Sequence, residues 1–379
     1  MKKSISFLHP FSAKAIGLNE DDLYFSHSKP QEKAMLKMQE EGYAVAIDYF
    51  TGNIMPYVKT INGIKKRFWP VTKPLGKNRH VWRRQYSWFH YIANYLKTSD
   101  VTIINMSGHG SKYCFKLAKL LRKRGKPYIA MIGGMHLSTE GPAKEYFQHA
   151  HHIIVHTELQ RKQLLQLETF KDLDIEVMPL GIDTEVFVPK QKNNPDIELL
   201  FVGRISRLKQ IELCFESVDY LRNNQDRKVK LTVIGPVSDS EYYSELKALA
   251  SELQIIDIVD FVGVVDHNNL VPYYQKAHLL LLPSAHESFG MVMVEAMACG
   301  TPVAALKGSG GPDEIVEDGF NGILASKESF AKQVLEFVQS TKMQQELTTN
   351  SRIMVEKKWS LKQTEVAMRK SIDKVFDTL

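Results

Sequence analysis

The chain has 379 residues, of which 44% are hydrophobic and 24% charged, a composition typical of globular proteins large enough for two domains. Its three cysteines, Cys114, Cys214 and Cys299, form neither a CxxC nor a Cys/His pattern, so the sequence indicates neither a disulfide framework nor a zinc site and favours a reducing cytoplasm. The net charge of +6 is uneven: residues 1–190 hold 28 Lys and Arg against 17 Asp and Glu, the remainder 21 against 26, which predicts an anionic partner for the N-terminal half.

Short runs rich in Val, Ile and Leu alternate with longer helical patterns along the whole chain. The first run, in MKKSISFLHPFSAK, is too short for an export signal and is expected to be a buried strand. No apolar run approaches the roughly 20 residues that a membrane-spanning helix needs. Strands are predicted at 5–10, 44–50, 101–107, 127–134, 151–157 and 175–182, and in a second series at 197–205, 230–236, 259–265, 277–284, 301–306 and 321–326. Continuous apolar runs of this kind are typical of parallel sheets covered on both faces.

The two series predict an α/β fold with two doubly wound, Rossmann-like domains that face each other across a cleft. A polar, proline-bounded linker at 187–198 separates them, so we expect domains at 1–185 and 186–360. In such folds ligands bind beyond the carboxyl ends of the strands, so the cleft between the domains is the predicted place for chemistry.

The segment ESFGMVMVE, residues 287–295, places two glutamates at the ends of an otherwise uncharged run. If Glu287 opens a helix, a rise of about 1.5 Å per residue separates the two carboxylates by roughly 12 Å on one face, about the separation of sugar and ribose in a sugar nucleotide. Between them, the backbone N–H groups of Phe289, Gly290 and Met291 lie at a helix start, where unpaired donors attract phosphate.

The alternative is that Glu287 only caps the helix and Glu295 is exposed. Against this, the helix carries no other charge, so Glu295 would be a lone carboxylate on a buried element, which is costly unless it is hydrogen-bonded. Ribose hydroxyls would supply those bonds.

A second cluster lies in LLFVGRISRLKQ, where a strand ends at Gly203 and Arg204 and Lys209 opens the next helix. Two cations at the carboxyl end of a strand suit a diphosphate, because a leaving nucleoside diphosphate gains negative charge. A solvated surface is the alternative. The glycine-rich stretch LKGSGGPDEIVEDGFNG, residues 306–322, follows one strand later, although ordinary turns explain most such clusters.

Together these residues resemble the retaining glycosyltransferases of family 4, which have the GT-B fold. The matching segments are FVGRISRLKQ, VDFVGVVDHNNLVPYYQKAHLLLLPSAHESFGMVMVEAMACGTPVAA, GGPDEIVEDGFNGIL and GIDTEVFVP. The most specific feature is the E-x7-E spacing of Glu287 and Glu295 after Arg204 and Lys209.

The resemblance implies a role for each matching residue. Arg204 and Lys209 would bind the donor diphosphate, Glu287 the transferred sugar and Glu295 the ribose. The implied catalytic set is His136, Glu287, Arg204 and Lys209, and the donor-binding set is Arg204, Lys209, Gly235, Val264, Val265, Glu287, Phe289, Gly290, Met291 and Glu295. His136, in RGKPYIAMIGGMHLST, would lie beside the reacting carbon, and His109 matches an acceptor-side histidine.

The mechanism implied by the resemblance is transfer of a hexose from a nucleotide diphosphate sugar with retention of configuration. It needs no cofactor and no metal. It also needs no general base from the protein, because the leaving phosphate can take the acceptor's proton. The Asp-x-Asp at Asp172 and Asp174 lies in a polar link between helix and strand and is not expected to bind metal.

The stretch at residues 64–96 interleaves basic residues with Trp69, Trp82, Trp88 and several Phe and Tyr. This pattern suits peripheral contact with an anionic membrane, and it equally suits a plain core with a solvated basic face. Nucleic acid, which also uses basic and aromatic residues, is less favoured. A glycan or lipid-linked glycan of surface polysaccharide biosynthesis (capsule, lipopolysaccharide or exopolysaccharide) is the hypothesis for the acceptor, with the protein cytoplasmic at the inner face of the membrane.

The final amphipathic segment, 361–379, is expected to pack back on the N-terminal domain, as the last helix does in the fold that the chain resembles. Two other classes of function stay open: a sugar-nucleotide epimerase or phosphorylase on the same fold, and a non-catalytic basic binding module.

Overall fold

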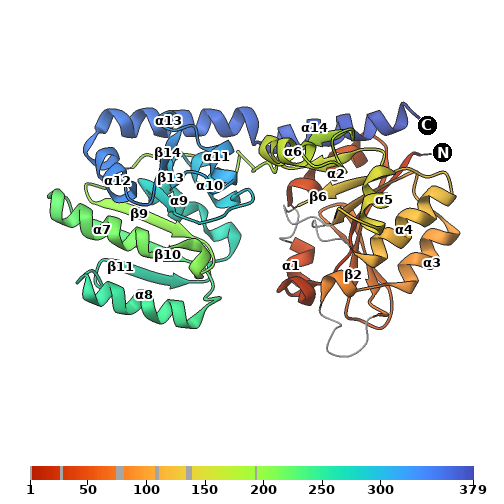
Figure 1. Cartoon of the computed structure of the whole chain (residues 1–379), viewed down its shortest axis with the longest axis horizontal. Helices are drawn as coiled ribbons and strands as arrows, with labels where there is room; N and C mark the ends of the chain where they lie inside the picture. The colour runs from red at the N-terminus through yellow and green to blue at the C-terminus, as the bar shows by residue number, and fades with distance from the viewer. Residues whose placement is uncertain (1, 26–28, 74–80, 107–110, 134–138, 193) are drawn as a thin grey trace. The chain divides into compact units, whose positions relative to one another are not determined.

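The computed structural model describes residues 2–25, 29–73, 81–106, 111–133, 139–192 and 194–379. The chain forms two compact units, Met1–Leu180 with Leu361–Leu379, and Gly181–Ser360 (Figure 1). The first boundary thus falls after Leu180, whereas the sequence pattern put it after residue 185. The reason is local, because Ile182 N–H donates to the carbonyl of Trp359 and so begins the second unit.

The first unit is built on a sheet with the order β3-β4-β2-β1-β5-β6-β7-β8, parallel except for β3. Its strands are β1 (Ser4–His9), β2 (Ala44–Thr51), β3 (Tyr57–Ile61), β4 (Ile64–Pro70), β5 (Val101–Met106), β6 (Tyr128–Ile132), β7 (Ile153–Val155) and β8 (Ile175–Val177). Its helices are η1 (Ala13–Ile16), α1 (Glu20–Phe25), α2 (Lys29–Glu40), η3 (Trp82–Arg84), α3 (Trp88–Leu96), α4 (Lys112–Lys123), α5 (Pro142–Gln148), α6 (Glu158–Leu165) and α14 (Leu361–Phe376). Every strand predicted in this unit is present, so the parallel-sheet prediction is confirmed.

The sequence reading missed the hairpin of β3 and β4. Its two-residue turn is Asn62-Gly63, and both residues have positive φ, 51° and 82°. Asn-Gly is the preferred pair for such a turn, so a local signal existed. The strand itself gives no such signal, because β4 alternates between buried and more exposed residues and lacks the continuous apolar run of the other strands.

Two cations of the basic stretch at 64–96, Lys66 and Arg67, make their ion pairs with carboxylates of the first unit. Lys66 is fully buried, pairs with Glu32 at 2.5 Å and donates to the carbonyls of Leu23 and Tyr24, which end α1. Arg67 pairs with the buried carboxylate of Asp48. Lys66 and Arg67 of β4 therefore serve the interior of the unit, because they pair with carboxylates and Lys66 also donates to helix-end carbonyls. Membrane contact by the rest of the stretch stays a prediction.

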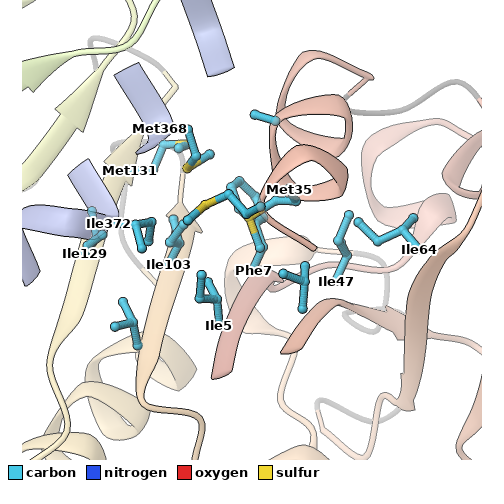
Figure 2. Packing of buried hydrophobic residues seen from close by; sticks show 14 of the residues in the cluster. Ile5, Phe7, Met35, Ile47, Ile64, Ile103, Ile129, Met131, Met368 and Ile372 are labelled. Carbon is cyan, nitrogen blue, oxygen red and sulfur yellow. The ribbon is translucent and has the colours of Figure 1, made fainter. Parts of the chain in front are cut away.

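The C-terminal helix α14 is part of the core of the first unit. Figure 2 shows Met368 and Ile372 of α14 beside Met131 and Ile129 of β6, in one cluster of buried residues that extends to Phe7. Lys374 adds ion pairs with Asp174 and with Glu176 of β8, the latter at 2.8 Å. Asp174 of the Asp-x-Asp thus serves to dock this helix.

The second unit has a parallel six-stranded sheet with the order β11-β10-β9-β12-β13-β14 (Figure 1). Its strands are β9 (Ile197–Val202), β10 (Val229–Ile234), β11 (Val259–Gly263), β12 (Leu279–Leu282), β13 (Val303–Leu306) and β14 (Gly322–Ala325). Its helices are η4 (Arg207–Lys209), α7 (Glu212–Asn224), α8 (Ser240–Glu252), η5 (His267–Asn269), α9 (Val271–Lys276), α10 (Met291–Ala298), α11 (Gly311–Ile315), α12 (Phe330–Gln339) and α13 (Thr341–Lys358). All the strands predicted here are present as well.

Three other properties bear on function. Cys114, Cys214 and Cys299 are buried free thiols. Within the described ranges, no three His, Cys, Asp or Glu side chains are grouped so as to hold a metal ion. The same ranges contain no helix with the length and apolarity to cross a bilayer.

Acidification is expected to destabilise the first unit through His152, whose Nε2 contacts the hydroxyl of Ser371 on α14. Burial lowers the pKa of His152 to about 4, whereas a histidine in an unfolded chain titrates near about 6.5. Between these values the unfolded state binds the extra proton, so the free energy of unfolding falls as pH decreases, by roughly 2 kcal/mol at about pH 5. Urea unfolding at about pH 7.5 and pH 5, monitored by a signal that reports on this unit, measures the loss in the free energy of unfolding.

The variant His152→Gln removes the titrating group and should flatten this pH dependence. His149→Gln is the matched control, because His149 is an exposed histidine close to His152 in the chain. An unchanged pH dependence in His152→Gln would mean that other groups cause it.

Candidate functional site

The predicted site residues of the second unit follow neighbouring strands at one edge of its sheet. Val264 and Val265 follow β11, Gly235 follows β10, Arg204 follows β9, and the segment 287–291 follows β12. Because the strands are parallel, their carboxyl ends share this edge, where ligands bind in doubly wound sheets. Val264 is 73% exposed, so its apolar side chain is free to contact the flat ring of a bound ligand, such as the base of a nucleotide.

An ion pair joins two of these loops. Lys209 Nζ lies 2.5 Å from Glu287 Oε2, and both side chains are largely buried. Backbone pairing keeps the loops together, because Ala285 N–H donates to the carbonyl of Leu208 at 2.8 Å. Lys209 and Glu287 therefore lie side by side, as expected if both belong to one binding site.

Glu287 does not open a helix, and the expected helical spacing of the two glutamates is wrong. Its N–H donates to the carbonyl of Ser309 at 2.7 Å, and its carbonyl accepts from Gly311 N–H at 2.6 Å, so it forms a bridge to the loop after β13. Helix α10 begins only at Met291, after Gly290 with φ of 89°. Gly290, with its positive φ, keeps the helix from extending back to Glu287, and Glu287 is held by backbone pairing to a neighbouring loop.

Glycine is required where these loops touch. A Cβ on Gly311 would lie 2.3 Å from the carbonyl oxygen of Phe289, and one on Gly235 would lie 1.9 Å from the carbonyl oxygen of Gly203. Neither approach is compatible with any side chain. The glycine-rich stretch at 306–322 therefore belongs to the site through its contact with the Glu287 loop.

Phosphate-binding groups are expected at the start of α10. Gly290 is the N-cap and Met291 the first helical residue, so the N–H groups here have no acceptor within the helix. The ring of Phe289 is buried and leaves only its backbone at the site. The predicted phosphate contact by Phe289, Gly290 and Met291 stays a prediction.

Arg204 and Arg207 differ in the availability of their charge. Arg207 makes a bidentate ion pair with Glu245 of α8 at 2.6 and 2.7 Å and lies near Asp239 and Glu241. Arg204 is exposed and has no ion pair with any residue in the described ranges. Of these two arginines, Arg204 is the one that can bind an anionic ligand.

The carboxylate of Glu295 is 3% exposed, so the alternative that it is an exposed residue is wrong. Tyr274 donates to its Oε2 at 2.6 Å, and His267 Nε2 lies 2.9 Å from Oε1. Burial, with the Glu295 charge next, raises the pKa of Tyr274 well above its usual value, which keeps the phenol a hydrogen-bond donor. The hydrogen bonds that the sequence argument assigned to ribose are thus provided by the protein.

Sequence reasoning missed Tyr274 and His267. Each lies on a separate short element between β11 and β12, α9 and η5. The only signal was their position in the resembling segment. Their spacing from Glu295 along the chain gives no signal, because the contacts form only when separate elements pack together.

His136 and His109, predicted on the catalytic and acceptor sides, lie outside the described residues.

Comparison with known proteins places this site in context. Residues 183–354 match the family model described as "Glycosyl transferases group 1". The D-inositol 3-phosphate glycosyltransferase of Mycobacterium sp. (strain KMS) is 36% identical over 186 residues, which span 46% of this chain and 41% of that protein. Sucrose-phosphate synthase from Thermosynechococcus elongatus has a TM-score of 0.74 at 19% identity, with both chains covered completely. Anabaena HepE in complex with UDP has a TM-score of 0.71 at 17% identity, over 98% of this chain and 100% of that one.

The whole-chain structural likeness identifies the GT-B fold, two parallel-sheet α/β units, as the resemblance in sequence predicted. Every site residue described above lies within residues 183–354, the segment that matches the model of the group 1 glycosyl transferases. The chain spans less than half the length of the curated relative that it matches.

Removing the Tyr274 hydroxyl should destabilise the second unit. Tyr274→Phe leaves Glu295 buried with one donor fewer, so we expect a loss of about 1–3 kcal/mol in the free energy of unfolding. Adding Glu295→Gln should make the loss smaller than the sum of the two single changes, because the charge that needs the donor is gone. Urea unfolding of the two single variants and the double variant measures this coupling.

Tyr273→Phe is the matched control, since that neighbouring ring is only partly buried. Additive effects of Tyr274→Phe and Glu295→Gln would show that the contact contributes nothing to stability.

Proposed function

We propose that this protein is a glycosyltransferase that moves a hexose from a nucleotide diphosphate sugar to an acceptor hydroxyl, with retention of configuration and without metal. The observation that carries the proposal is that one sheet edge brings together the Lys209–Glu287 ion pair, the start of α10 and Arg204, which has no ion pair among the described residues. This set lies within the segment that matches the model of the group 1 glycosyl transferases, which supports the proposal.

The donor's charge and its hydroxyls are matched by different groups. Lys209 has three N–H donors and so can contact a phosphate oxygen while it keeps its pair with Glu287. Arg204 adds a planar fork of donors for the same diphosphate. Glu287 accepts from hydroxyls of the transferred sugar. Glu295 keeps its contacts with Tyr274 and His267 and uses a remaining acceptor position for a ribose hydroxyl.

In the proposed reaction the bond between the anomeric carbon and the phosphate oxygen breaks, and a bond from the acceptor oxygen to that carbon forms on the same face. The acceptor's proton goes to the leaving phosphate, so no protein base is required. Arg204 and Lys209 stabilise the negative charge that the diphosphate gains. His136 is proposed to contact the donor sugar beside the reacting carbon.

The proposed acceptor is a glycan or lipid-linked glycan of surface polysaccharide biosynthesis, with the enzyme in the cytoplasm at the inner face of the membrane. The basic N-terminal half supports an anionic environment for this half of the chain.

The alternatives differ in their products. An epimerase would yield an epimerised nucleotide sugar, a phosphorylase a free sugar phosphate, and a binding module no product at all. A transferase yields a glycosylated acceptor and a free nucleoside diphosphate, and the configuration of the new bond tests retention.

Nucleotide binding is the first experiment. Calorimetric titration of UDP, GDP and ADP in the presence of EDTA should detect binding of at least one in the micromolar range. Arg204→Ala should weaken it by about tenfold or more, the equivalent of about 1.4 kcal/mol, because a charged donor to the diphosphate is lost.

Arg207→Ala is the control, because Glu245 already neutralises Arg207, and it should leave the affinity within about twofold. Equal losses in both variants would point to general attraction of anions. Failure of folded wild-type protein to bind any of the three nucleotides would refute the donor site.

A further inference from the structure

Helix α3 is folded with its polar side inward. His90 and Asn94 are 1% and 8% exposed, whereas Ile92, Tyr95 and Leu96 are 51%, 57% and 74% exposed. A surface helix normally has the opposite arrangement.

A buried charge explains the inner face. The carboxylate of Asp48 on β2 is fully buried and accepts from Arg67 Nε at 2.6 Å and from the Trp69 indole at 2.7 Å. His90 of α3 lies 3.8 Å from the same carboxylate, and its other ring nitrogen contacts the hydroxyl of Tyr113. Because the sheet presents a charged network here, the helix must present polar groups to it.

The outer face of α3 is consequently apolar. Its exposed side chains are Trp88, Phe89, Ile92, Tyr95 and Leu96. We call these five side chains the α3 face. All five lie on one helix of nine residues, where they form a contiguous apolar patch. Ordinary protein surfaces expose apolar side chains singly and scattered.

Cations lie directly against these rings. Lys116 Nζ of α4 is 4.6 Å from the centre of the Trp88 ring, and the guanidinium of Arg124 is 4.9 Å from that of Tyr95. Figure 1 shows α3 beside α4, the helix from which Lys116 comes. Lys97, at the end of α3, is exposed as well.

No opposite charge is supplied by the surrounding sequence. Residues 49–99 contain ten Lys and Arg and not one Asp or Glu. Of the ten, Lys66 and Arg67 are used internally, and Arg83, Arg84 and Lys97 are exposed in the described ranges.

We propose that the α3 face binds an anionic lipid bilayer, with Phe89, Ile92 and Leu96 inserted at the boundary of headgroups and acyl chains. Lys116 and Arg124 then contact lipid phosphates. Apolar residues on one helix face with cations at its margin are the pattern of such interfacial helices. The proposal deepens the proposed function and rests on it for its purpose, since a lipid-linked acceptor brings the enzyme to a membrane.

Other occupants fit the chemistry less well. Two copies of the α3 face would bring like charges together, because Lys116 and Arg124 lie against its rings. Nucleic acid would need flat rings for stacking, and Ile92 and Leu96 have none.

Flotation with vesicles tests the proposal. Wild-type protein should bind vesicles of phosphatidylglycerol and phosphatidylcholine at low salt and bind phosphatidylcholine vesicles much more weakly. The triple variant Phe89→Ser, Ile92→Ser, Leu96→Ser should bind the anionic vesicles about tenfold more weakly or worse, because its apolar insertion is lost. Lys116→Gln and Arg124→Gln should each cost about fivefold and reduce the preference for anionic lipid.

Val366→Ser is the matched control, because Val366 is an exposed apolar residue, 56% exposed, on α14 of the same unit. It should bind vesicles like the wild type. Circular dichroism shows whether the triple variant is folded, and the single variant Leu96→Ser, at the most exposed position of the face, repeats the test with less disturbance.

Nucleotide titration of the same samples separates this proposal from the proposed function. Unchanged nucleotide binding with lost vesicle binding supports the α3 face as a separate membrane surface. Equal vesicle binding by wild type and triple variant, or none by the wild type, overturns it. So does a dimer of the wild type that the triple variant abolishes, which would assign the face to a second copy.

Discussion

The ion pair between Lys209 and Glu287 is the interaction on which the candidate site depends. It joins the loops after β9 and β12, and Glu287 in turn pairs its backbone with the loop after β13. These three strands are neighbours in a parallel sheet, so their loops emerge at one edge. The charge pair is favourable there because backbone pairing and close-approaching glycines bring the loops within reach before any ligand binds.

Buried carboxylates determine local structure in both units. In the second unit Glu295 is held by Tyr274 and His267, so its orientation is set before a donor arrives. In the first unit Asp48 draws Arg67, Trp69 and His90 inward, and the apolar side of α3 is left outside as a result. One buried charge therefore accounts for both a stable sheet and an unusual surface.

The first unit also shows how one basic stretch can serve two purposes. Lys66 and Arg67 of β4 pair with carboxylates inside the unit, whereas α3 and the α4 cations next to it form an exposed apolar and basic surface. Composition alone treats the two halves as one segment. Only the direction of each side chain separates them.

The sequence by itself determined the parallel sheets, since continuous apolar runs mark strands that are covered on both faces, and it identified the cations and glutamates of the second unit as one group. It did not reveal the hairpin of β3 and β4, whose strand alternates in polarity, although Asn62-Gly63 is a local turn signal. Tertiary structure decided that Glu287 lies in a loop outside α10, that Tyr274 and His267 hold Glu295, and that α3 faces solvent with its apolar side. Each of these depends on contacts between residues far apart in the chain, which periodicity and spacing along a single segment do not record.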